Sequence, residues 1–188
     1  GSGTIGVRLS ADKELQDALA TAAATGLGDW GGILEGVRED IPSDVGMLFL
    51  MILGKIPSEW AVDRGTDHDG TAWLSATRSF ESLEELERLA QEGPLSSFVD
   101  PAQYALLQDE GFFATKTAFS TIGSLSELVA ASSEVGQSIP LELLERALRV
   151  ENRVTLPGTV RDNNADEIDG NTLIWEVVAS STREMYAG

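Results

Sequence analysis

The chain has no cysteine and a single histidine, His68, among its 188 residues. Without cysteine, the sequence can form no disulfide, thiolate metal site, iron–sulfur cluster or cysteine nucleophile. One histidine cannot supply a typical multi-histidine metal sphere, and a Ser-His-Asp triad could use only His68 itself. His68 lies in TDHDG (66–70), where the neighbouring Asp and Gly residues indicate a solvated hairpin tip. We therefore expect no metal site and no cofactor.

Basic residues are also scarce: 13 Lys and Arg stand against 31 Asp and Glu, for a formal charge of −18. Binding to nucleic acid or to anionic lipid headgroups requires clustered Lys and Arg, so both are disfavoured. The simplest use of this charge is solubility. The apolar fraction of 42% is enough for one globular domain with a buried core.

Long hydrophobic runs are absent as well. The longest, VGMLFLMIL (45–53), is far shorter than the roughly 20 residues that a membrane-spanning helix needs. Its Met and Leu content favours a helix at 44–54. Such side chains repack around irregular ligands, so Leu48, Phe49, Met51 and Ile52 are the candidate contacts for an apolar ligand. The competing interpretation is that these four residues are ordinary core.

Catalytic signatures are missing from the sequence. It contains no GxSxG nucleophile elbow and no GxxxxGK[ST] phosphate loop, and GLGDWGG (26–32) lacks the GxGxxG spacing. Two carboxylates suffice for a glycosidase, but nothing selects one pair among 31 acidic residues. The sequence therefore predicts a protein that is not an enzyme.

Periodicity predicts an α+β fold, in which a mainly antiparallel sheet has helices packed on one face and a helical insertion. In residues 4–12, Ile5, Val7 and Leu9 alternate with polar residues, and Ser82 with Glu85 forms a capping box for a helix. We expect one domain at 4–188 after an expression remnant at 1–3, and a helical subdomain at about 101–147. Strands are expected at 4–12, 59–64, 71–80, 111–121, 148–160 and 171–180. Helices are expected at 11–25, 82–92, 125–136 and 140–148, the first with Ser10 or Asp12 as its N-cap. A helical turn is expected at 101–111.

Residues 162–169 concentrate six acidic or amide side chains: Asp162, Asn163, Asn164, Asp166, Glu167 and Asp169. The first three oxygen positions of a calcium-binding EF-hand loop fit from Asp162. However, Glu167 replaces the required glycine and Leu173 replaces the closing acid. A hairpin explains the segment better. Gly158 and Thr159 would continue the incoming strand, and Asp169-Gly170-Asn171 would form the turn.

The same segment resembles a motif of LppM-like, membrane-anchored bacterial surface lipoproteins. The match lies in LPGTV, NNA, DGNT and LIWEV, through Pro157, Gly158, Ala165, Gly170 and Trp175. The resemblance implies an extracytoplasmic α+β domain attached to the cell envelope. It also implies a lipidated cysteine and often a C-terminal transmembrane helix, both outside this sequence, and binding of lipid or glycolipid in place of catalysis. The family motif carries no catalytic residue.

Three hypotheses follow. The first is a non-enzymatic extracytoplasmic domain of a membrane-anchored (lipo)protein that binds lipid or another apolar ligand. The alternative is a protein-interaction or scaffold module of the cell envelope, without a ligand pocket. A carboxylate-based hydrolase is a weaker third.

Overall fold

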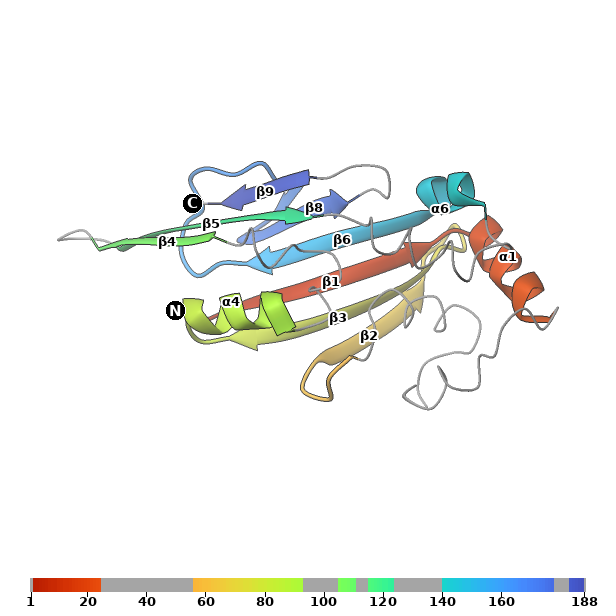
Figure 1. Cartoon of the computed structure of the whole chain (residues 1–188), viewed down its shortest axis with the longest axis horizontal. Coiled ribbons are helices and arrows are strands. Elements are labelled where there is room, and N and C mark those ends of the chain that lie inside the picture. Colours follow the sequence, from red (N-terminus) through yellow and green to blue (C-terminus); the bar gives the residue numbers. More distant parts are fainter. Residues whose placement is uncertain are drawn as a thin grey trace.

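The computed structural model describes residues 2–24, 56–92, 105–110, 115–123, 140–177 and 183–187. Its strands form two antiparallel sheets (Figure 1): a six-stranded large sheet of order β2-β3-β1-β6-β8-β7, and a three-stranded small sheet of order β4-β5-β9. The α+β class and the mainly antiparallel sheet are thus confirmed. The strands are β1 (Gly3–Ala11), β2 (Ala61–Thr66), β3 (Ala72–Phe80), β4 (Ala105–Glu110), β5 (Thr115–Gly123), β6 (Leu148–Thr155), β7 (Glu167–Asp169), β8 (Thr172–Val177) and β9 (Arg183–Ala187); the helices are α1 (Lys13–Ala24), α4 (Leu83–Glu92) and α6 (Leu141–Ala147).

Strand β1 lies at the centre of the large sheet, between β3 and β6. Leu9 is opposite Leu74 on one side and Val150 on the other. Because side chains alternate along a strand, this register gathers apolar residues on one face, as the pattern at Ile5, Val7 and Leu9 predicts. The buried residues of this apolar face are Ile5, Val7, Leu9, Leu74, Ala76, Phe80, Val150, Val154, Leu173, Trp175 and Val177.

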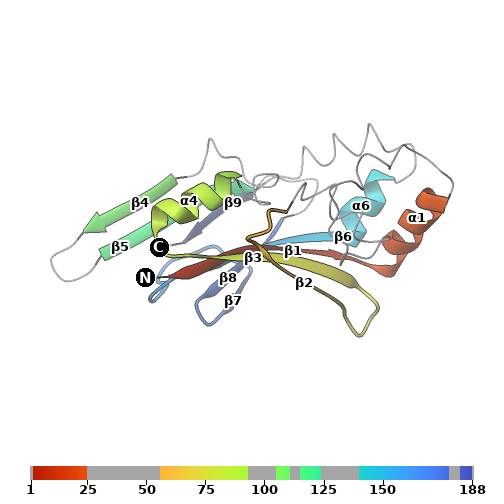
Figure 2. The same ribbon diagram turned by 90° about the horizontal axis from the view of Figure 1, so that it is seen from below.

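Several elements contribute to the core against this apolar face, among them α1 with Leu15 and the segment before β2 with Trp60. Figure 2 shows α4, α6 and the small sheet on the same side of the large sheet. Helix α4 contributes Leu86 and Leu89, α6 contributes Leu144, and β9 contributes Met185 and Ala187 to one buried cluster. The helices and the five-residue strand β9 together shield the apolar face of the large sheet from water.

The helix starts follow local hydrogen-bond chemistry. Asp12 Oδ1 accepts a bond from Leu15 N at 2.9 Å, so Asp12 is the N-cap of α1 and Ser10 stays in β1. At α4, Ser82 Oγ accepts a bond from Glu85 N at 3.2 Å. Glu85 Oε2 in turn accepts one from Glu81 N at 2.9 Å, one residue earlier than a standard capping box.

The structure departs from three predictions about chain conformation. The expected helical turn at 101–111 is a strand over 105–110, because pairing of β4 with β5 overrides the helical propensity of ALLQDE. In the region 101–147, expected to hold a helical subdomain, the described residues form β4, then β5 close to the strand predicted at 111–121, and they become helical only at α6. Gly158 does not continue a strand: β6 ends at Thr155, and Gly158 turns the chain with φ +97°.

Gly3 was set aside with the first residues, yet it belongs to β1 and lies opposite Phe80. The helices expected at 44–54 and 125–136 lie outside the described residues. None of the helices in the described part of the chain is long and apolar enough to cross a membrane.

Candidate functional site

The four residues that the sequence offers as ligand contacts, Leu48, Phe49, Met51 and Ile52, lie outside the described residues, so that site stays a prediction. Two other features of the described structure could serve binding. One is the junction between β9 and the large sheet, and the other is the polar face of the large sheet.

Asn164 fastens β9 to the large sheet. Its Oδ1 accepts hydrogen bonds from Trp175 Nε1 at 2.8 Å and from Tyr186 N at 2.9 Å, while its Nδ2 donates to Glu184 O at 2.7 Å. Its backbone N also donates to Tyr186 O at 3.3 Å. One amide thus joins the loop before β7, the indole of β8 and the backbone of β9. We call Asn164, Trp175, Glu184 and Tyr186 the Asn164 clasp.

The acidic and amide residues around the clasp organise the local backbone. Asn163 Oδ1 accepts a bond from Ala165 N at 3.0 Å, and Asp166 Oδ2 accepts one from Glu176 N at 2.8 Å. Strands β7 and β8 are joined by a two-residue turn in which Gly170 has φ +61°, the sign that a type II′ hairpin turn requires. The predicted turn at Asp169-Gly170-Asn171 and the strand after it are confirmed, but the incoming strand of this hairpin is β7, and β6 pairs with the other side of β8. No group of three His, Asp or Glu residues suited to a metal ion occurs in the described ranges.

Asn152 lies on the apolar face, directly beneath β9. It pairs with Val7 of β1 and Trp175 of β8 and is 3% exposed. Its Nδ2 donates to the sulfur of Met185 at 3.5 Å, a weak acceptor, and its buried Oδ1 has no hydrogen-bond partner among the described residues. Leaving such a carbonyl unsatisfied costs about 1–3 kcal/mol, so an apolar residue would be the more stable choice here.

The opposite face of the large sheet is polar and centred on Arg8. The Arg8 guanidinium lies 4.6 Å from the ring centroid of Trp73, and its Nη2 is 3.3 Å from Asp67 Oδ2. Gly65 makes room for this stack, because a Cβ at that position would lie 2.7 Å from Trp73 Cζ2. The cation–π contact and the ion pair hold the guanidinium in one orientation on a half-exposed surface.

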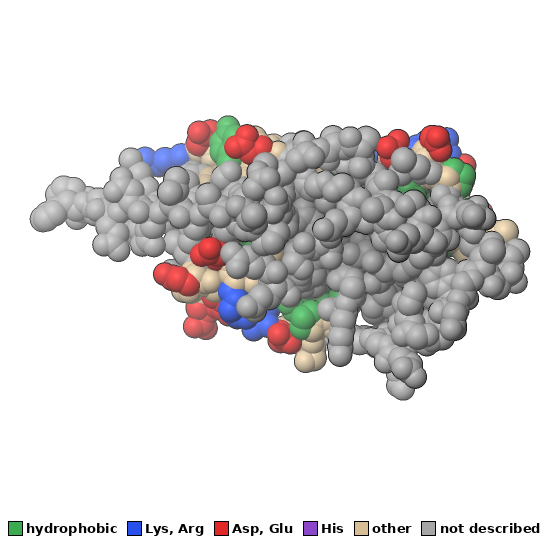
Figure 3. Space-filling view, viewed as in Figure 1, with side chains coloured by type: hydrophobic (Ala, Val, Ile, Leu, Met, Phe, Trp, Pro, Cys, Tyr) green, Lys and Arg blue, Asp and Glu red, His purple; other side chains and the backbone are tan. Residues whose placement is uncertain are grey.

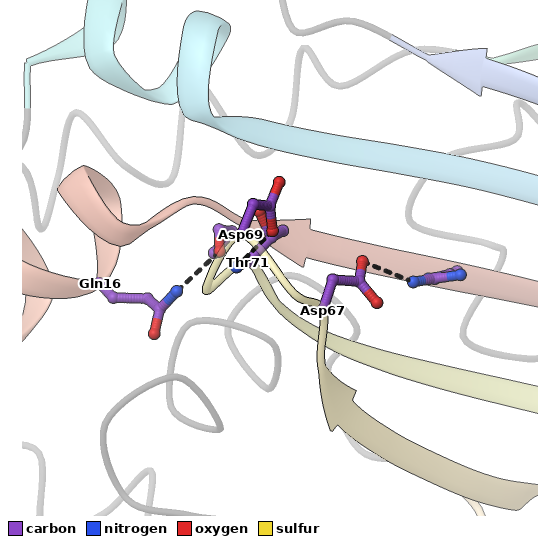
Figure 4. Close-up of polar contacts among 6 residues, drawn as sticks. Gln16, Asp67, Asp69 and Thr71 are labelled. Atoms are coloured by element: carbon purple, nitrogen blue, oxygen red, sulfur yellow. Dashed lines mark hydrogen bonds and ion pairs between the residues drawn. The ribbon is translucent and has the colours of Figure 1, made fainter.

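The turn between β2 and β3 holds Asp67 in place (Figure 4). Gln16 Nε2 donates to Gly70 O at 2.9 Å, and Asp69 Oδ1 accepts a bond from Thr71 N at 2.9 Å. Hydrogen bonds from the Thr71 backbone and side chain lower the pKa of Asp69. Their support of the turn is therefore present above the ordinary carboxyl pKa and is lost as pH falls through the lowered one. His68 is exposed at this turn, so the predicted hairpin tip is confirmed.

A hydroxyl row and a hollow lie at the far end of the polar face. Thr4 Oγ1 donates to Thr155 Oγ1 at 2.9 Å, and Thr155 shares a 2.8 Å bond with Thr172. The hollow, about 350 Å³, is lined by Thr4, Glu59, Ala61, Thr77, Arg78 and Ser79. Among the described residues that line it, Glu59 carries the one carboxylate, which lies 3.0 Å from Arg78 Nη1, so these residues do not supply the pair of carboxylates that a glycosidase uses.

Figure 3 shows the side of the molecule that carries α4 and the small sheet. The described acidic side chains visible there form small separate groups near the margins. On this side, the described acidic side chains, which contribute to the formal charge of −18, therefore form an ordinary solvated surface.

The clasp predicts a specific effect of Asn164→Ala. Loss of the amide leaves Trp175 Nε1 and Tyr186 N without that acceptor, so the free energy of unfolding should fall by about 1–3 kcal/mol. Solvent exchange of these two protons, followed by NMR, should accelerate at least tenfold. Asn163→Ala is the matched control, because it removes only the bond to Ala165 N. Equal exchange rates in the two variants would contradict the role given to Asn164.

No protein-family model and no curated protein matches the chain. Among solved structures, it is similar to the folded domain of the LppM protein of Mycobacterium tuberculosis, determined by NMR. The match has 21% sequence identity and a TM-score of 0.37, and it covers 71% of this chain and 66% of that domain. This is a weak and partial relation of fold.

Proposed function

We propose that this chain is a non-enzymatic, extracytoplasmic domain of a membrane-anchored bacterial protein, and that it binds a lipid or another apolar ligand between β9 and the large sheet. The envelope location, the anchor and the lipid rest on the sequence resemblance at 153–177. The place of binding rests on one observation: the five-residue strand β9, which pairs with β5 of the small sheet, covers Asn152 on the apolar face, and the Asn164 side chain links it to the large sheet.

The way in which β9 is held supports reversible opening. Strand β9 is tied to the large sheet by a few hydrogen bonds at its rim, and it pairs with β5 within the small sheet. Strands β9 and β5 can therefore move off the large sheet together at a free energy below that of global unfolding. Opening would uncover Met185, Trp175 and the middle of β6, all of them buried in the closed form. An apolar molecule would restore the lost burial at roughly 25 cal/mol for each Å² of apolar surface it covers.

The negative charge of the chain limits how it can contact a lipid. With 31 acidic and 13 basic residues, the domain repels anionic headgroups at long range. The apolar part of the ligand must therefore supply the affinity, in keeping with a site on the apolar face of the sheet.

An engineered disulfide tests whether binding needs release of β9. Asn163 and Ala187 form an isolated antiparallel bridge. Such pairs have Cα atoms about 4.5–5.5 Å apart, within the range of a disulfide. The double variant Asn163→Cys with Ala187→Cys contains no other cysteine. Titration with the fluorescent apolar dye N-phenyl-1-naphthylamine should show binding by wild type and by the reduced variant, and at least tenfold weaker binding by the oxidised variant.

The reduced form is the control for the substitutions themselves, since both forms have the same sequence. Equal dye affinity in the oxidised and reduced forms would remove β9 from the binding site. Failure of the dye and of long-chain alcohols to bind wild type would contradict the apolar-ligand function altogether.

One feature favours the alternative of a protein-interaction module. Arg8 is already oriented by Trp73 and Asp67 on the polar face, and the neighbouring Ser75 and Thr77 are half-exposed. Arginine beside an aromatic residue is common where proteins meet. In this case the partner would contact the polar face, and β9 would remain closed.

A photo-crosslinking residue placed at Thr77 separates the two functions. The interaction module predicts a crosslink from position 77 to one identifiable envelope protein, weakened by Arg8→Ala. The same crosslinker at His68, on the hairpin tip, is the control. Equal labelling from both positions, or none from position 77, would count against the polar face.

A further inference from the structure

Asn152 is a polar residue at a buried position whose neighbours are apolar. Its neighbours across the strands, Val7 and Trp175, are fully buried, and so are the neighbours along its own face of β6, Val150 and Val154. A buried amide in such surroundings normally has both ends hydrogen-bonded. Here Nδ2 reaches only the Met185 sulfur, and Oδ1 has no partner among the described residues.

The position of Asn152 links it to the Asn164 clasp. Trp175 pairs with Asn152 in the register of β6 and β8, and its indole nitrogen bonds to Asn164 at the rim. Met185, which contacts Asn152, lies between the two β9 residues that the clasp holds, Glu184 and Tyr186. Release of β9 at Asn164 would therefore move Met185 away from Asn152.

We propose that Asn152 Oδ1 is the polar anchor for a neutral, mostly apolar ligand that carries one hydroxyl group, such as a long-chain alcohol. The inference rests on the proposed function, and it specifies the chemistry of that ligand. The hydroxyl donates its hydrogen to Asn152 Oδ1, and the hydrocarbon part takes the place of Met185 over Val7 and Trp175.

The surroundings of Asn152 select a neutral donor. Among the described residues, the buried polar side chains are those of Ser10 and Asn152, and none of the buried side chains is charged. An ionised carboxylate, phosphate or ammonium group placed there would lose its hydration without gaining an opposite charge. A hydroxyl has one proton to donate, and Oδ1 is the acceptor that lacks one. Site and ligand are thus complementary in the number of hydrogen bonds as well as in polarity.

A pair of ligands that differ only in the donor tests the anchor. Dodecan-1-ol and dodecyl methyl ether would each compete with N-phenyl-1-naphthylamine for wild type and for Asn152→Leu, which replaces the amide with an apolar group of similar size. Wild type should bind the alcohol about five- to tenfold more tightly than the ether, the ratio expected for one hydrogen bond. The variant should bind both compounds equally.

A second measurement keeps the test independent of any packing change in the variant. In wild-type protein labelled with ¹³C and ¹⁵N, saturating alcohol should shift the Asn152 side-chain carbonyl resonance, and the ether should leave it unchanged. If wild type binds both compounds with equal affinity, or if Asn152→Leu retains the preference for the alcohol, the anchor is wrong and the proposed function stands. If neither compound displaces the dye from wild type, the proposed function and the inference fail together.

Discussion

The apolar face of the large sheet must be covered, and the rest of the described structure depends on how this is achieved. Antiparallel pairing of β1 with β3 and β6 brings their apolar side chains onto a single face. A sheet of this kind is stable in water only with a second layer. Helices α1, α4 and α6 supply part of that layer, and β9 supplies the part over Asn152 of β6.

The elements that cover the apolar face are held in place by different forces. Helix α4 is held by Leu86, Leu89 and Ala90, whose burial is a hydrophobic contribution spread over many atoms. Strand β9 adds Met185 and Ala187 to the core, but directional hydrogen bonds to Asn164 fix its edge. Hydrogen bonds to a single amide are lost together when that amide is displaced. The junction at β9 is therefore the part of the described layer best suited to opening, and beneath it lies Asn152.

Local patterns predicted the elements whose conformation is set by nearby residues. The alternation in β1, the amphipathic stripe of α4 and the TDHDG turn all carry their signal within a few residues. The helical turn expected at 101–111 failed because pairing with β5, outside that segment, decides the conformation of β4. Likewise, β9 pairs with β5 and contacts Asn164. No local pattern within residues 183–187 predicts either partner.

The candidate site was predictable only in outline. The resemblance at 153–177 drew attention to Gly170 and Trp175, and the structure gives both a clear role in the hairpin. It did not reveal Asn164, which was counted among the acidic and amide residues of a solvated loop. Asparagine in a turn often binds nearby backbone, so the NNA segment carried a usable signal. Asn152 could not have been found, because its isolation depends on the register of three strands and on β9.

The most direct test of this account is the environment of the Met185 methyl group in wild-type protein. Because β9 lies over Asn152 in the closed form, a nuclear Overhauser spectrum should show cross-peaks from this methyl group to the Asn152 side-chain amide. Cross-peaks to the solvent resonance and none to Asn152 would show that β9 does not cover the sheet, and would contradict the account.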